Sequence, residues 1–452
     1  MRESEVLSIT SLNFDPYEYE YQGRITTLDG IEHFVNLQYL DCRNYGLTSC
    51  DVSQNTALIQ FAVQGTQNLT SLDFSNNPNI QALYLNGNNG LTSMNLTGCN
   101  QLSNLQLFGS ALTSLDIPNK AAMTNLLFGG SLKLDPKDYP NLTGLGCENL
   151  ELTDLNTFIP DNIKSQLHTL FCGDNELESL DLSKYSNLGT LWCGNNNIEE
   201  LDLSHVPNLY SFQCYGNKIK VLDISNNEGL NDLMCSWQQL DENMILQLTP
   251  NQKTILVDNN AYFNPSEENV TLEIVVVNES ELKSAVEAGY NVKLGAGFAI
   301  SSAVVVDKTL TIDMNGKTLT FAGDGFEVTA GTLTIKGNGT MNAGTKGDSW
   351  VAVWANGGNA VIENGTFSVV EGKDDSTNDC IYAKGGTITI NGGTFSNNGT
   401  YYPSMGGVVI NANNTVANSK VVINGGTFNP ATGCVVYEQA DIDAGRIVLN
   451  NN

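Results

Sequence analysis

The chain has 452 residues, a formal net charge of −28 and only 15% charged residues. This length allows two or more domains, each with a sizeable core. The acidic balance and the presence of only four arginines exclude nucleic acid and disfavour an anionic membrane surface as partners, because both need clustered cations. No apolar stretch of about 18 residues exists, so no membrane-spanning segment is predicted.

A repeat of 21 residues runs through the first half of the chain. Cys172, Cys193, Cys214 and Cys235 are spaced at this interval, and a Leu-Asp-Leu/Ile-Ser unit recurs between them. A fixed period of this length predicts a solenoid, in which each turn buries its apolar edge against its neighbours. The strands of ten predicted rungs are marked by Leu40, Phe61, Leu83, Leu105, Leu126, Leu145, Leu170, Leu191, Phe212 and Leu233.

The spacing of the rungs is 21 or 22 residues except around Leu145, where it becomes 19 and then 25. The surrounding segment, Leu132 to Gln166, contains three prolines that follow Asp, Tyr or Ile. Proline limits regular hydrogen bonding, so this segment is predicted to be a bulging loop or a distorted rung.

Six cysteines share one position of the repeat, which other rungs fill with valine, leucine or phenylalanine. This exchange is typical of a buried apolar position. Stacked rungs would place neighbouring cysteines about 4.8 Å apart with parallel Cβ directions, which does not suit a relaxed disulfide. We therefore predict a column of reduced, buried thiols: Cys42, Cys147, Cys172, Cys193, Cys214 and Cys235.

The rung template L-x-x-L-x-C/L-x-x-N-x-L-x-x-L-D-L-S, over about residues 25–240, resembles the leucine-rich repeat family and its short bacterial IRREKO class. The segment from Leu28 to Leu37 looks like the first-turn cap of gut-bacterial members. The resemblance implies a curved solenoid with a parallel sheet on one face, used mostly for binding proteins. It also implies a structural asparagine column of Asn88, Asn175, Asn196 and Asn217.

Side chains that flank the inward positions of each strand point onto the sheet face. Apolar and aromatic residues recur there, and such a band is more often an interaction site than scattered aromatics are. The alternative is that another domain, a long loop or lateral packing covers it. The candidate ligand-binding residues are Tyr84, Phe108, Leu127, Phe171, Trp192, Tyr215 and Met234.

A column of aspartates follows the same repeat. Stacked carboxylates could bind calcium, but one carboxylate per rung favours local bonding to backbone N–H groups. No metal or other cofactor is predicted. The column consists of Asp51, Asp73, Asp116, Asp181, Asp202 and Asp223.

The repeat domain is predicted to span residues 1–258, with a terminal helix over residues 241–248 that has Asp241 as its N-cap and covers the open end of the solenoid. Residues 259–269 are predicted to be a linker. Beyond it, Asn278 and Glu281 predict the start of a second helix, which ends at Gly289.

Residues 270–452 show strand-like alternation with recurring glycine turns, and the rung spacings are 27, 28 and 33 residues. This pattern resembles the pectate-lyase-like right-handed β-helix superfamily. The fold class is therefore expected to be mainly β: a leucine-rich repeat solenoid in series with a right-handed parallel β-helix. Two internal stacks are predicted, Met341–Phe367–Phe395–Phe428 and Ile335–Ile362–Ile390–Ile423.

Many members of this superfamily cleave acidic polysaccharides with aspartates and an Arg, Lys or His partner. Here residues 270–452 contain no histidine and one arginine, Arg446, and the three histidines His33, His168 and His205 lie far apart in the first solenoid. The absence of histidine and the near absence of arginine from residues 270–452 favour binding over catalysis. The best acidic constellation is Glu371, Asp374, Asp375 and Asp379 with Lys373 and Lys384.

Together these patterns predict a non-catalytic, extracellular or cell-surface binding scaffold, adhesin-like or glycan-recognising. Its ligand would be a neutral or basic protein or glycan, and the protein is expected to be a monomer whose signal or lipid anchor lies outside this sequence. The open alternatives are a polysaccharide lyase or hydrolase with its active site on residues 270–452, and a purely structural spacer.

Overall fold

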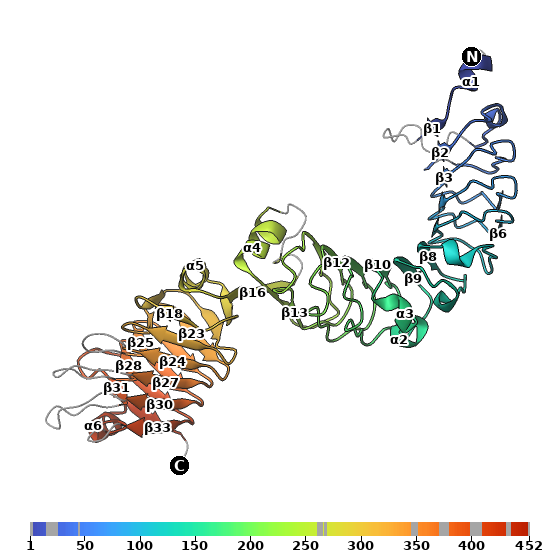
Figure 1. Cartoon of the computed structure of the whole chain (residues 1–452). Coiled ribbons are helices and arrows are strands. Elements are labelled where there is room, and N and C mark those ends of the chain that lie inside the picture. Colours follow the sequence, from blue (N-terminus) through green and yellow to red (C-terminus); the bar gives the residue numbers. More distant parts are fainter. Residues whose placement is uncertain are drawn as a thin grey trace. The chain divides into compact units, whose positions relative to one another are not determined.

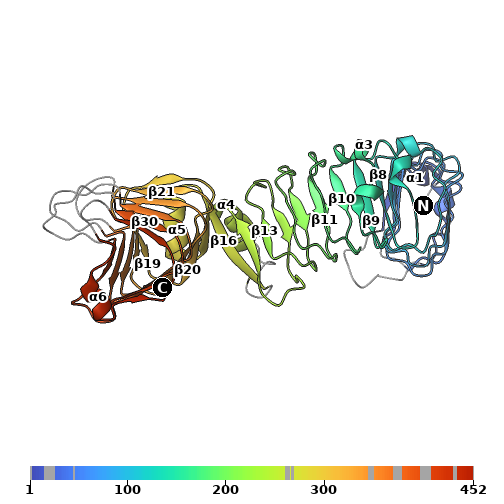
Figure 2. The same ribbon diagram turned by 90° about the horizontal axis from the view of Figure 1, so that it is seen from below.

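The structure, a computed structural model, describes residues 3–14, 26–43, 46–259, 265, 269–344, 351–369, 379–397, 409–430 and 435–450. Its contacts divide the chain into two compact units (Figures 1 and 2). The first contains Met1–Met244 and Ile255–Val270, and the second contains Ile245–Thr254 and Thr271–Asn452. Most of the predicted linker, 259–269, lies outside the described residues, so the linker stays a prediction.

The first unit is a parallel β-solenoid built around one sheet. All ten predicted rung residues lie in its strands, in register from rung to rung, so these predictions are confirmed. One further strand, β1, precedes them and was not predicted. In sheet order the strands are β1 (Ser11–Asn13), β2 (Tyr39–Asp41), β3 (Gln60–Ala62), β5 (Ala82–Tyr84), β7 (Asn104–Gln106), β8 (Asn125–Gly129), β9 (Gly144–Glu148), β10 (Thr169–Phe171), β11 (Thr190–Trp192), β12 (Ser211–Gln213) and β14 (Asp232–Met234).

Short elements complete the rungs of this unit. Several lie in the segment from Leu132 to Gln166, which is irregular, as predicted. Asp135 and Asp154 cap two of its turns by accepting backbone N–H groups. The elements are α1 (Glu3–Val6), η2 (Ile31–His33), β4 (Ser71–Asp73), β6 (Ser93–Asn95), η3 (Lys120–Ala122), η4 (Pro136–Asp138), α2 (Leu155–Phe158), α3 (Asp161–Lys164), β13 (Val221–Asp223) and η5 (Thr254–Asp258).

The asparagine column joins consecutive rungs. Nδ2 of Asn196 donates to the carbonyl oxygens of Cys172 and Cys193 at 3.1 and 3.0 Å, while its Oδ1 accepts from Leu177 N at 3.0 Å. Asn217 repeats this pattern one rung later. These amides satisfy buried backbone groups that no strand partner reaches, which confirms their structural role.

The aspartate column bonds locally. Asp181 Oδ1 and Asp202 Oδ1 each accept the backbone N–H two residues later at 2.9 Å, and Asp51, Asp73 and Asp223 do the same. The pKa of both carboxyls is lowered by hydrogen bonds. The largest contribution comes from the side chain of Ser183 for Asp181 and of Ser204 for Asp202, and the backbone N–H of the same serine comes second. Five of the six carboxylates thus cap turns, as the local alternative predicted, and Asp116 is the exception among the described residues.

The six cysteines of the column are free and buried, as predicted. Burial raises the pKa of the Cys193 thiol to about 12, and it raises the pKa of its neighbours Cys172 and Cys214 well above the ordinary value. A thiol in this environment stays protonated and packs as a small apolar side chain.

The helix predicted over 241–248 is wrong. The structure has a strand there, β15 (Met244–Leu248), followed by the short helix α4 (Pro250–Lys253), which has a capping box of Thr249 and Gln252. Met244, Leu246 and Leu248 are buried at alternate positions, which suits a strand in a sheet. The pairing of β15 in the sheet thus outweighs the preference of Asp241 for a helix N-terminus.

The second unit is a parallel β-solenoid with three sheets. The first sheet contains β15, β16 (Val270–Val276), β17 (Asn291–Leu294), β20 (Leu310–Asp313), β23 (Thr332–Lys336), β26 (Asn359–Ile362), β29 (Thr387–Ile390), β32 (Lys420–Ile423) and β34 (Ile447–Leu449). The second contains β18 (Phe298–Ile300), β21 (Thr318–Phe321), β24 (Thr340–Ala343), β27 (Thr366–Val369), β30 (Thr394–Asn397) and β33 (Thr427–Pro430). The third contains β19 (Val304–Val306), β22 (Phe326–Val328), β25 (Val353–Asn356), β28 (Ile381–Lys384) and β31 (Ile410–Ala412).

Both predicted internal stacks of this unit are confirmed by strand register. The rings of Phe367, Phe395 and Phe428 follow one another at 5.2 Å between centroids, nearly parallel. The predicted helix is α5 (Glu279–Ala288), capped by Asn278 and ended by Gly289 in a left-handed conformation. Near the end of the chain lies α6 (Gln439–Asp443).

We expect Cys193→Val to lower the free energy of unfolding by less than about 1.5 kcal/mol, because valine fills the same apolar position. Cys193→Asp should lower it by about 3 kcal/mol or more, because it buries an unpaired charge. Urea denaturation followed by circular dichroism measures both. Non-reducing mass mapping that found Cys172 linked to Cys193 in the native protein would contradict the reduced column.

We expect Asn196→Ala to destabilise the fold by about 2–4 kcal/mol, because it leaves two buried carbonyl groups and one buried N–H group without partners. Asn197→Ala is the matched control, since Asn197 is the adjacent asparagine and only half-buried. Urea midpoints of the two variants give the comparison. Equal midpoints would show that the Asn196 amide stabilises the fold no more than the half-buried amide of Asn197 does.

Candidate functional site

Five of the seven predicted band residues lie in strands of the first unit, namely in β5, β8, β10, β11 and β14, and Phe108 and Tyr215 lie two residues after the ends of β7 and β12. Their exposure differs along the band. Leu127 is buried with 5% of its surface exposed, whereas Met234 is exposed at 40%. Tyr84, Phe108, Phe171, Trp192 and Tyr215 are half-buried, so each ring offers part of its surface to solvent.

Three of the seven residues form a contiguous aromatic surface. The rings of Phe171 and Trp192 are stacked with centroids 4.3 Å apart and planes 23° apart, and the Phe108 ring lies 6.3 Å from Phe171. Trp192 Nε1 donates to Ser211 Oγ at 3.2 Å, and this hydroxyl donates to Asp232 Oδ2 at 2.6 Å. The hydrogen bonds hold the indole in one orientation, which reduces the entropy lost when a ligand stacks on it.

Glycines in the same columns make room for the rings. A Cβ on Gly146 would stand 2.3 Å from Phe108 Cζ, and a Cβ on Gly194 would stand 2.7 Å from Tyr215 Cε1. Both distances are too short for a side chain. The Phe108 ring therefore lies over the backbone of Gly146, two rungs further on, and the Tyr215 ring lies over the backbone of Gly194 in the preceding rung.

Sequence reasoning did not single out Glu148, at the end of β9. Its carboxyl borders a groove of about 450 Å³ together with Phe108, Gly129, Gly130 and Asp174. Burial, and then the negative charge of Asp174, raise the pKa of Glu148 to about 7. Burial, Asp174 and Glu148, in that order, also raise the pKa of Tyr215. The phenol and both carboxyls thus belong to one acidic and aromatic region.

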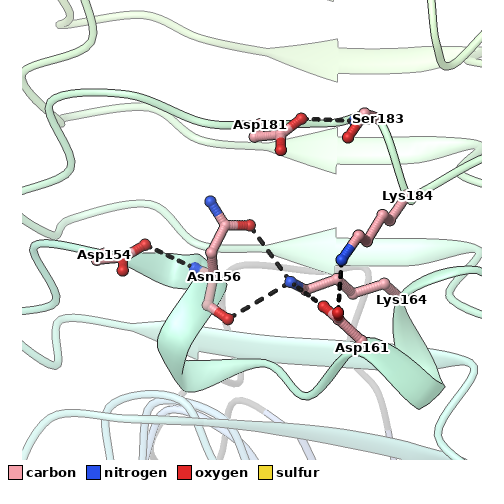
Figure 3. Close-up of polar contacts among 7 residues, drawn as sticks. All are labelled: Asp154, Asn156, Asp161, Lys164, Asp181, Ser183 and Lys184. Carbon is pink, nitrogen blue, oxygen red and sulfur yellow. Dashed lines mark hydrogen bonds and ion pairs between the residues drawn. The ribbon is translucent and has the colours of Figure 1, made fainter.

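The irregular segment carries a polar cluster that holds α2 and α3 together (Figure 3). Lys164 is almost fully buried, and its ammonium donates to Asp161 Oδ1 at 2.8 Å and to the side-chain and main-chain oxygens of Asn156 at 3.3 and 3.4 Å. Lys184 also pairs with Asp161, and hydrogen bonds from the two lysines lower the pKa of that carboxyl to about 2. Every donor has a local acceptor, so the cluster is structural.

The acidic constellation considered for catalysis is only partly visible, since Glu371, Lys373, Asp374 and Asp375 lie outside the described residues. Asp379 is 3% exposed and accepts from Asn411 Nδ2 at 2.7 Å, and burial raises its pKa to about 7. The ammonium of Lys384 lies 5.8 Å from the centroid of the Trp354 ring.

Among the described residues, no three His, Cys, Asp or Glu side chains gather in a way that could hold a metal ion. In the same part of the chain, every helix is too short or too polar to cross a membrane.

No family model matches the sequence, and no curated protein matches it. Among solved structures, the functional domain of InlJ from Listeria monocytogenes, described as including a cysteine ladder, is 21% identical and aligns over 70% of this chain and 77% of that chain, with a TM-score of 0.41. The internalin InlF of the same organism is 20% identical over 61% and 83% of the two chains, with a TM-score of 0.37. The parallel β-solenoid of the first unit is established by its own rungs and their register.

Proposed function

We propose that this chain is a non-catalytic binding scaffold, extracellular or on the cell surface, whose ligand lies on the sheet face of the first unit. The observation that carries the proposal is the contiguous, oriented surface of Phe108, Phe171 and Trp192. Aromatic side chains provide large apolar contact area at low conformational cost, and they dominate the energetics of many protein interfaces. They also stack on the apolar faces of sugars.

The charge of the repeat domain supports a neutral or basic ligand. Residues up to position 266 include 30 acidic and 11 basic residues. Such an excess repels acidic partners and speeds the approach of basic ones. The ligand in this proposal is a protein or a glycan, and an adhesin-like monomer is the simplest form of the protein.

The second unit is proposed to be a right-handed β-helix of the pectate-lyase-like class, which extends the scaffold without catalysis. Its stacked phenylalanines and its capping helix α5 support this assignment. A polysaccharide lyase or hydrolase stays the rival from another functional class.

We expect Trp192→Ala to weaken binding of the ligand by about 2 kcal/mol or more, because it removes the best-oriented anchor of the band. Glycan and protein arrays probed with the full chain would identify the ligand, and titration calorimetry would measure the change in its affinity. Circular dichroism confirms that the fold is intact.

Trp354→Ala is the matched control for this experiment. Trp354 belongs to the second unit and also stacks on a neighbouring ring, that of Tyr382, with centroids 6.2 Å apart. Loss of affinity in Trp192→Ala alone supports the proposed face. Loss in Trp354→Ala alone would move the ligand to the second unit and overturn the proposal.

We expect the full chain to release neither unsaturated nor reducing sugar ends from polygalacturonate, because residues 270–452 contain no histidine and only one arginine, near the end of the chain. Absorbance of unsaturated products and a reducing-end assay measure this. Release that disappears in the double variant Asp374→Ala, Asp375→Ala would establish the enzyme instead.

A further inference from the structure

The groove beside Phe108 joins an aromatic ring to two carboxyls that come from different rungs. Glu148 ends β9, and Asp174 follows the next strand, β10. Glycines at 129 and 130 also line the groove, and they contribute no side chains to it. The groove has a volume of about 450 Å³ and lies at the edge of the aromatic surface.

The two carboxyls lack a nearby cation in the described part of the chain. Asp174 Oδ1 accepts from the neutral amide of Asn195 at 2.8 Å. Glu148 makes no side-chain hydrogen bond or ion pair there, although its carboxyl is half-buried. Lys133, in the segment after β8, donates to the carbonyl oxygen of Leu150 instead. Two carboxyl groups thus line one groove, and no cation of the described residues pairs with either.

A positively charged planar group would satisfy this site. Resting on the proposed function, we propose that the groove receives an arginine side chain of a protein partner, whose guanidinium pairs with Glu148 and Asp174 while its flat face lies against Phe108. Guanidinium combines planar stacking on a ring with a fork of N–H donors that matches carboxylate oxygens. A sugar hydroxyl would donate a hydrogen bond to a carboxylate oxygen, but it would leave the repulsion between the carboxylates in place.

Binding of arginine at this groove is linked to protons. Among the described residues, the titratable groups that interact with Glu148 are the Asp174 carboxylate, the Tyr215 phenol and the buried thiols of Cys147 and Cys172. None of them carries a positive charge. The pKa of Glu148 in the free protein is about 7, raised by burial and then by Asp174. Below this pH the carboxyl is neutral and loses its attraction for the guanidinium, so affinity should fall as pH falls.

The test titrates the full chain with a capped pentapeptide that carries one arginine between glycines. A second peptide carries citrulline, which has nearly the same shape without the charge. Saturation-transfer NMR at constant ionic strength measures both affinities. We expect the arginine peptide to bind at pH 8 and to bind about tenfold more weakly at pH 6, because the ionised fraction of a group with pKa 7 changes by about tenfold over this range.

Two variants with the same change of charge separate this groove from the overall acidity of the chain. Glu148→Gln should lose both the preference for arginine over citrulline and the dependence on pH. Glu199→Gln should keep both, because Glu199 lies in a different groove, lined by Leu180, Leu201 and Val221.

Equal binding of the arginine and citrulline peptides would overturn the inference, and so would no detectable binding of either. Methyl glycosides that bind in a Glu148-dependent manner, where the arginine peptide does not, would assign the groove to a sugar. In each case the effect of Trp192→Ala on the array ligand still decides the proposed function separately, since Trp192 does not line this groove.

Discussion

The fixed register between neighbouring rungs is the constraint on which the rest of the first unit depends. Cys172 N donates to Trp192 O and Cys193 N donates to Gln213 O, both at 2.8 Å, and the same bond recurs one rung later. Because each rung pairs only with its neighbours, a residue repeated in the sequence becomes a column in space. The interior thiols, the asparagine amides beside them and the rings on the outer face are three such columns.

The irregular spacing of the rungs around Leu145 changes the shape of the outer face of the sheet. Strands β8 and β9 are the longest of the main sheet, and they approach so closely that a Cβ on Gly129 would stand 2.2 Å from the Glu148 carbonyl oxygen. Glycine is required at such an approach. Because Gly129 and Gly130 have no side chains, a groove remains there, and Phe108 and Glu148 line it. An irregularity in the repeat thus creates the chemically distinct part of the surface.

Features that depend on local or strictly periodic signals were predictable from the sequence. The rung strands, the thiol and asparagine columns, the aspartate turns and the caps of α5 all follow from residues within one repeat or one turn. Strand β15 was not predicted. Its alternating apolar residues indicate a strand, but Asp241 suggested the start of a helix. The raised pKa of Glu148 could not be predicted from the sequence either, because burial and the charge of Asp174, a residue of the next rung, cause it. Leu127 shares the outer column yet is buried, and periodicity alone does not report that.

The buried, protonated thiols of the cysteine column have a consequence for the conditions in which the protein can work. A thiolate is the species that attacks a disulfide or an oxidant, and burial withholds it from the cysteine column. The packing of this column therefore involves no disulfide bond. Because the column contains no disulfide, we expect it to form without an oxidase or a disulfide isomerase and to pack in the same way in reducing and oxidising media.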